Sequence, residues 1–127
     1  ARRYIDVFIY PVADFYDGHS DGKIYAHQYK SIKQQIDRAA KSGWYKENRL
    51  LAEDVFQVGE PSLWVNYARY RMVRNKRDVF STLYLVKKGD KWMKIRCEFP
   101  VSEITSAADF LNEEIFYLIE NIDVNMK

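Results

Sequence analysis

The longest pattern in the sequence is an alternation of apolar and polar residues that runs from Trp44 to Phe99. An alternation of period two is typical of β-strands that bury one face. It is interrupted by turn-forming stretches at residues 59–61, 75–78 and 88–90. These connections are short enough to require hairpins, so the pattern predicts antiparallel strands. The four expected strands cover residues 49–58, 63–74, 78–87 and 91–99.

A further strand and a helix precede this region. Residues 4–10 also alternate, and Pro11 ends the run, which predicts another strand. Apolar residues then recur at steps of four and three between Tyr25 and Ala39, as on one face of an amphipathic helix. Gly43 stands where a helix commonly ends in a left-handed residue.

A second amphipathic helix is expected at the end of the chain. Ser106 and Asp109 have the spacing of a capping box, in which each side chain satisfies a free backbone amide. The apolar stripe that follows consists of Leu111, Ile115, Leu118 and Ile122, flanked by Phe110 and Ile119. The sequence therefore predicts one α+β domain over residues 1–127. It is an antiparallel sheet of about five strands flanked by two amphipathic helices, in the order β-α-β-β-β-β-α.

Composition excludes several classes of protein. The chain has 127 residues, of which 47% are hydrophobic and 16% aromatic, with only 5 Gly and 3 Pro. Such a composition excludes disordered, collagen-like and linker sequences. No run approaches the roughly 18 apolar residues of a membrane span. Cys97, the one cysteine, excludes an internal disulfide and a cysteine-based zinc site, and its apolar neighbours predict a buried side chain.

The small net charge of +2 hides an uneven distribution. Residues 60–100 carry 10 basic and 4 acidic residues, whereas residues 101–127 carry 1 and 6. Aromatic and basic side chains alternate on two of the predicted strands. If the hairpin register places them on one face, that face is a binding surface for an anionic or protein partner. The six candidate binding residues are Tyr67, Arg69, Arg71, Trp92, Lys94 and Arg96.

Three interpretations of these six residues remain open. They form a surface that binds another protein, they hold a small anionic ligand, or they are an ordinary solvated sheet face whose counter-charge is the acidic last helix. Nucleic acid is disfavoured as a partner, because phosphate-driven binding calls for a basic domain and no nucleic-acid-binding motif is present.

The turn before the first helix partly matches a calcium-binding loop. Asp17 and Asp21 fit ligand positions one and five, but His19 occupies position three, and Gln28 at position twelve has no carboxylate. The alternative is a plain turn in which Ser20 or Asp21 caps the helix. We assign no metal or cofactor and keep Asp17, His19 and Asp21 as the candidates to examine.

No catalytic residue is assigned. The chain has no phosphate-binding loop, nucleophile elbow or dinucleotide fingerprint. Glu53 and Asp54 are adjacent in a predicted strand, so they point to opposite faces and cannot act as a carboxylate pair.

Several segments together are similar to a known kind of domain. They are Asp6-Val7-Phe8-Ile9-Tyr10, Tyr29-Lys30-Ser31-Ile32-Lys33, Val58-Gly59, Tyr67-Ala68-Arg69-Tyr70, residues 83–91 and Phe110-Leu111. In this order they resemble the PsbP-like and DcrB-like domains of bacterial and plastid extracytoplasmic proteins. The resemblance implies an α/β/α sandwich, exported to the periplasm or tethered as a lipoprotein, that serves as an accessory factor. Such domains begin with an extra hairpin, so we expect upstream residues or a leader to be missing before Ala1.

The sequence thus leads to two hypotheses about function. The first is a non-enzymatic accessory or binding domain of the bacterial cell envelope, with another protein as its partner. The alternative is a pocket domain that binds a small anionic ligand, or acts on it as an enzyme, through the six candidate binding residues.

Overall fold

The computed structural model describes residues 4–43, 46–59 and 62–123, with backbone alone for Tyr4 and residues 103–112. The strands are β1 (Tyr4–Pro11), β2 (Lys46–Val58), β3 (Leu63–Arg74), β4 (Arg77–Lys88) and β5 (Lys91–Pro100). The helices are α1 (Asp21–Lys41) and α2 (Ile104–Asn121), with 3-10 turns η1 (Asp14–Tyr16) and η2 (Val101–Glu103). The predicted α+β class, with five antiparallel strands and two helices, is confirmed. The predicted order is matched roughly, because a long α1 precedes β2 and two 3-10 turns intervene.

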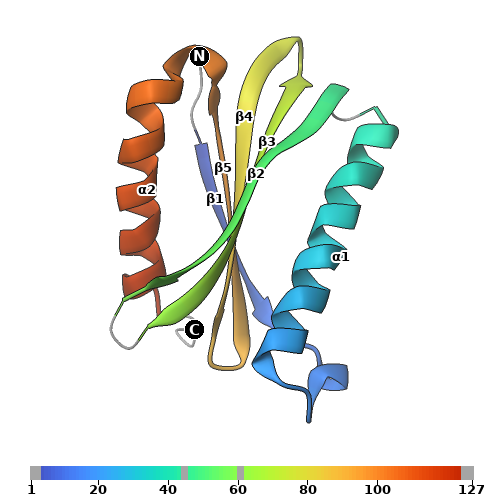
Figure 1. Ribbon diagram of the computed structural model, residues 1–127, viewed down its shortest axis with the longest axis vertical. Helices are drawn as coiled ribbons and strands as arrows, with labels where there is room; N and C mark the ends of the chain where they lie inside the picture. Colours follow the sequence, from blue (N-terminus) through green and yellow to red (C-terminus); the bar gives the residue numbers. More distant parts are fainter. Residues whose placement is uncertain (1–3, 44–45, 60–61, 124–127) are drawn as a thin grey trace.

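The strands lie in the order β1-β5-β4-β3-β2, and every neighbouring pair is antiparallel. β1 and β2 are therefore the two edges of the sheet. Figure 1 shows α1 and α2 on opposite sides of the sheet, which gives three layers. Within the part of the chain that the structure describes, neither helix is long and apolar enough to cross a membrane.

α1 covers one face of the sheet. Ile32 and Ile36 of the predicted stripe are buried against apolar residues of β3, β4 and β5, and Ile24, which precedes that stripe, is buried there too. Ser20 is the N-cap, and its hydroxyl oxygen accepts a hydrogen bond from the Lys23 N–H at 3.4 Å. The helix is followed by Gly43 at a φ of 90°, the left-handed position expected after its end.

α2 covers the opposite face. Ile115 and Ile119 are fully buried there, and the Lys88 ammonium donates to the carbonyl oxygens of Ile119 and Ile122 at 2.7 Å each. A cation at this end of a helix satisfies free carbonyls and complements the helix dipole.

α2 begins earlier than the sequence predicts. It starts at Ile104, three residues before a capping box at Ser106 would start it, because the η2 turn after Pro100 leads directly into the helix. The side chains of the predicted capping box, and those of Phe110 and Leu111, lie outside the described residues.

Candidate functional site

The six candidate binding residues do not share one face, so the register does not meet the condition for a common binding surface. Paired residues in a sheet point to the same side, and Tyr67 pairs with Tyr84, which in turn pairs with Ile95. Tyr67, Arg69 and Arg71 therefore lie on the α2 side of the sheet. Trp92, Lys94 and Arg96 alternate with Ile95 and lie on the α1 side.

Trp92 is a core residue rather than a stacking platform. Its side chain is 1% exposed, and its ring meets the edge of Tyr25 of α1 with centroids 5.2 Å apart. Tyr67 is half-buried between Phe56 and Tyr84, with centroid distances of 6.4 and 5.3 Å. Neither ring is free to stack on a ligand.

The arginines on the α2 side are held by the sheet itself. Arg69 donates to the Thr82 hydroxyl at 3.3 Å, and its guanidinium lies 5.6 Å from the ring centroids of Tyr67 and Phe99. Arg71 makes two hydrogen bonds to the Asp78 carboxylate, which holds the pKa of Asp78 below its usual value.

Lys94 and Arg96 lie on the α1 side, so the sheet stands between them and α2. Arg96 donates to Ser81 at 2.9 Å, and the Lys94 ammonium lies 4.8 Å from the centroid of the Phe8 ring. Burial and the nearby Arg96 lower the pKa of Lys94. Among the described residues, Glu98 pairs with Arg74 across the sheet at 3.0 Å, and Asp21 of α1 lies 3.5 Å from Lys87 of β4. The contact of α2 with Lys88 uses backbone carbonyls.

The residues examined for calcium binding do not form a ligand cluster. Asp21 lies 3.5 Å from the Lys87 ammonium, and the backbone turns into α1 at Ser20. Among the described residues, no group of three or more His, Cys, Asp or Glu side chains is close enough to hold a metal. The stretch that contains Asp17 and His19 connects the η1 turn to α1, and Ser20 caps the helix.

Cys97 is buried on the α2 side of β5, as the alternation predicts. It is 1% exposed, and burial raises the pKa of its thiol to about 12. A thiol in this state is a poor nucleophile, because the thiolate is the reactive form.

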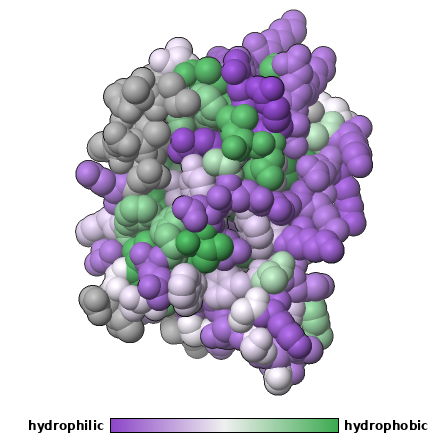
Figure 2. Space-filling view, in the orientation of Figure 1, coloured by the Kyte–Doolittle hydropathy of each residue, from purple (hydrophilic) through white to green (hydrophobic). Residues whose placement is uncertain are grey.

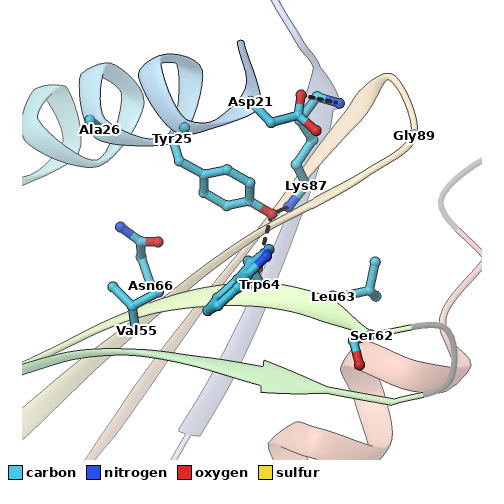
Figure 3. Close-up of a pocket in the computed structure, with 11 residues that line it drawn as sticks. Asp21, Tyr25, Ala26, Val55, Ser62, Leu63, Trp64, Asn66, Lys87 and Gly89 are labelled. Atoms are coloured by element: carbon cyan, nitrogen blue, oxygen red, sulfur yellow. Dashed lines mark hydrogen bonds and ion pairs between the residues drawn. The ribbon is translucent and has the colours of Figure 1, made fainter.

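A pocket of about 680 Å³ lies between the first turns of α1 and the strands β2 and β3 (Figure 3). The sequence did not point to it. Its lining combines apolar side chains with an ion pair, a phenol and an amide. The residues are Asp21, Gly22, Tyr25, Ala26, Val55, Ser62, Leu63, Trp64, Asn66, Lys87 and Gly89.

Tyr25 joins α1 to the strands β3 and β4. Its hydroxyl donates to the Trp64 carbonyl oxygen at 2.9 Å and accepts from the Lys87 N–H at 2.6 Å (Figure 3). Burial raises the pKa of this phenol to about 12. Tyr25 is therefore a neutral structural link at the wall of the pocket rather than an acid or base.

Asn66 and Trp64 are the side chains of the pocket that remain available to a partner. Asn66 is 9% exposed, and its amide forms no hydrogen bond with any residue in the described part of the chain. Trp64 is 52% exposed and Val55 53%. Figure 3 shows Asn66 and Val55 rising from β3 and β2 toward α1. An amide at the wall of a pocket offers both a donor and an acceptor, so Asn66 marks a place for a ligand.

Replacing Tyr25 by phenylalanine is expected to lower the free energy of unfolding by about 1–2 kcal/mol, because it leaves the Lys87 N–H and the Trp64 carbonyl without a partner. Urea unfolding followed by circular dichroism measures the change. Tyr117→Phe is the matched control, since Tyr117 is 67% exposed. Equal stability of the two variants would show that the Tyr25 hydroxyl does not hold α1 in place.

A second polar contact joins α1 to β2. The Glu53 carboxylate accepts hydrogen bonds from the Lys33 ammonium and from the Tyr29 hydroxyl, the latter at 2.7 Å. These contacts hold the pKa of Glu53 below its usual value of 4.5. Unfolding raises that pKa, so the contribution of Glu53 to stability is present above pH 4.5 and is lost as the pH falls through the lower folded value.

Glu53→Gln is accordingly expected to cost at most about 1 kcal/mol at neutral pH, since the side chain is partly exposed, and less in acid. Urea unfolding of both proteins between neutral pH and pH 3 measures the difference. A cost that stays constant or grows toward acid would contradict the assignment.

No family model matches the chain, and no curated protein matches it closely enough to count as a relative.

Proposed function

We propose that the protein is a non-enzymatic domain of the bacterial cell envelope that binds an extended segment of another protein. The observation that carries the proposal is the position of the pocket beside an exposed edge of the sheet. Binding would use two parts of this surface. A partner strand would lie along β2, and one of its side chains would enter the pocket beside Trp64.

The edge strand β2 supports the first part. It spans 13 residues, and nearly all of them are exposed. Three exposed apolar residues lie on it, Leu50, Leu51 and Val55. Figure 2 shows two apolar patches separated by hydrophilic residues along the front of the molecule, where β2 runs in Figure 1. An exposed edge strand of this kind is a template for another strand.

Irregular pairing limits where on β2 a partner strand fits. Register shifts fall between Lys46 and Arg49 and between Leu50 and Ala52, and such bulges discourage strand addition. The segment after them, residues 52–58, pairs regularly with β3 and runs past the pocket. Its Val55 N–H is held by the Asp54 carboxylate at 2.8 Å, a local contact that a docking strand would replace.

The pocket supports the second part. A half-exposed Trp beside a concave apolar wall is a common anchor in protein interfaces. The Asn66 amide offers both a donor and an acceptor, which matches a backbone or side-chain amide of a polypeptide. The charged groups at the rim, Asp21 and Lys87, neutralise each other, so the pocket favours an uncharged group.

Three titratable groups, Tyr25, Cys97 and Glu53, are not tuned for acid–base catalysis. Burial raises the pKa values of Tyr25 and Cys97 to about 12, and hydrogen bonds lower that of Glu53. These shifts move each group away from neutral pH, whereas a general acid or base is tuned toward it.

The compartment is part of the proposal. It rests on the resemblance of the sequence to PsbP-like and DcrB-like domains, which implies an extracytoplasmic location. The gene upstream of Ala1 tests this part. A signal peptide or lipobox would support it, and a cytosolic start would contradict it.

Selection of short random peptides on the immobilised protein tests the binding site. Peptides that bind are expected to lose about tenfold or more in affinity for Trp64→Ala and to bind Tyr117→Ala as well as the wild type. Tyr117 is the control because it is an exposed aromatic residue on α2. Peptides that bind Trp64→Ala with undiminished affinity would refute this site.

A further inference from the structure

A second pocket lies beside the start of α1 and the η1 turn, and of its lining only Ala26 also lines the pocket proposed for a protein partner. It has a volume of about 530 Å³ and is formed by the η1 turn, the start of α1 and the loop between them. Its lining is apolar at the base and basic around it. The residues are Phe15, Tyr16, His19, Lys23, Ile24, Ala26, His27 and Lys30.

The basic residues of this pocket come together through the helix period. Lys23, His27 and Lys30 follow one another at steps of four and three, so they lie on one face of α1. His19 reaches the same pocket from the preceding loop. The pocket therefore gathers both histidines of the chain and two lysines.

No acidic side chain lines this pocket. Among the described residues, neither Lys23 nor Lys30 forms an ion pair. Asp14, Asp17 and Asp90 line an adjoining pocket, which shares Tyr16, His19 and Ile24 with this one. The uncompensated charge at this site is thus positive, and it favours an anion.

The apolar base is built from the η1 turn. Phe15 is 66% exposed, with its ring centroid 4.2 Å from that of Tyr16 and 5.9 Å from that of His27. Tyr16 is 5% exposed, and its hydroxyl is fixed by His27 Nδ1 at 2.6 Å and by Gln28 at 3.1 Å. An exposed aromatic ring on a fixed base is suited to a flat apolar group.

The Tyr16 contact also orients His27. The Tyr16 hydroxyl donates its one proton to the Gln28 amide oxygen, so its oxygen accepts a hydrogen bond from His27 Nδ1–H and holds the ring in place. Burial raises the pKa of Tyr16, which keeps this phenol neutral and makes it a positioning group for the histidine.

We infer that this pocket binds a small carboxylate with a flat aromatic body, whose ring packs on Phe15 and whose carboxylate faces Lys23 and Lys30. A ring and a carboxylate satisfy the two halves of the lining together. A phosphate alone leaves the apolar base uncovered, and a neutral aromatic compound leaves the cations unpaired.

Titration with naphthoate, followed by NMR of the imidazole protons at constant pH, tests the inference. The chain has only two histidines, and both line the pocket, so their signals report on this site directly. Naphthoate is expected to move both signals in a saturable manner. The double variant Lys23→Gln, Lys30→Gln is expected to bind it about five- to tenfold more weakly.

Two controls separate this site from general attraction of anions. Lys41→Gln with Lys76→Gln removes the same charge from exposed positions elsewhere and is expected to keep the wild-type affinity. Naphthamide, which has the ring without the charge, is expected to bind about tenfold more weakly than naphthoate. The inference is overturned if neither histidine signal saturates by about 10 mM naphthoate. It is also overturned if the amide binds equally well, or if the control variant loses as much affinity as the double variant in the pocket.

Discussion

Replacing Trp92 by alanine is expected to lower the free energy of unfolding by about 3–5 kcal/mol. Trp92 is 1% exposed beneath α1, where it contacts Tyr25 and belongs to the same apolar cluster as Leu83 and Leu85. The substitution removes a large apolar side chain and leaves a cavity that neighbouring strands cannot close, because the sheet fixes their positions. Urea unfolding followed by far-ultraviolet circular dichroism measures the loss.

Trp64→Ala is the matched control for this prediction. Trp64 is 52% exposed, so its removal is expected to cost about 1 kcal/mol or less. The two variants carry the same substitution and differ in burial. A similar loss of stability in both would contradict the placement of Trp92 in the core, and with it the register that puts Trp92 on the α1 side.

Cys97 is expected to react with a thiol reagent on the order of a thousandfold more slowly in the folded protein than in urea. Burial raises the pKa of its thiol from 9.0 to about 12, so very little thiolate forms at mildly alkaline pH. The side chain is also 1% exposed, which keeps the reagent away. Labelling with iodoacetamide at about pH 8, followed by mass spectrometry, measures the two rates.

The same experiment has an internal control. The chain has one cysteine, so each labelled molecule reports on Cys97 alone. The residual rate in the folded protein should rise in destabilised variants such as Trp92→Ala, because reaction then requires opening of the core. Rates within about tenfold of each other in buffer and in urea would show that α2 does not cover this part of the sheet.

The sequence predicted the secondary structure well because local chemistry determines it here. β3 has the predicted bounds, since a turn lies on each side of its alternating residues. Asn75 and Lys76 both take left-handed backbone angles, with φ of 52° and 63°, as a two-residue hairpin turn requires. The isoleucines of the α1 stripe are buried, and Gly43 takes the left-handed backbone angle expected after the end of the helix.

Whether the six candidate binding residues share one face depends on the register, and the turn lengths determine the register. The two-residue turn at Asn75–Lys76 pairs Arg74 with Arg77, and that register places Tyr67 opposite Tyr84. The turn after Lys88 then places Tyr84 opposite Ile95. The lengths of the two turns therefore place Tyr67 and Trp92 on opposite faces of the sheet, and both turn lengths can be read from the sequence.

The pocket beside Trp64 could not be predicted in the same way. It depends on the strand order, because β2 becomes an edge only when β1 pairs with β5 at the other end of the sheet. It also depends on the angle at which α1 crosses the sheet, which leaves Asn66 under the helix without a hydrogen-bonding partner in the described part of the chain. The alternation of apolar and polar residues carries no information about the strand order or about the angle at which α1 crosses the sheet.

The most direct test of the proposed function is photo-crosslinking in cells that naturally make the protein. A photoreactive amino acid at Val55, on the exposed edge beside the pocket, is expected to give one discrete protein adduct in the envelope fraction. The same amino acid at Tyr117, on the outer side of α2, is expected to give none, and Trp64→Ala should abolish the Val55 adduct. Equal adducts from both positions, or a Val55 adduct that persists without Trp64, would contradict binding at this site.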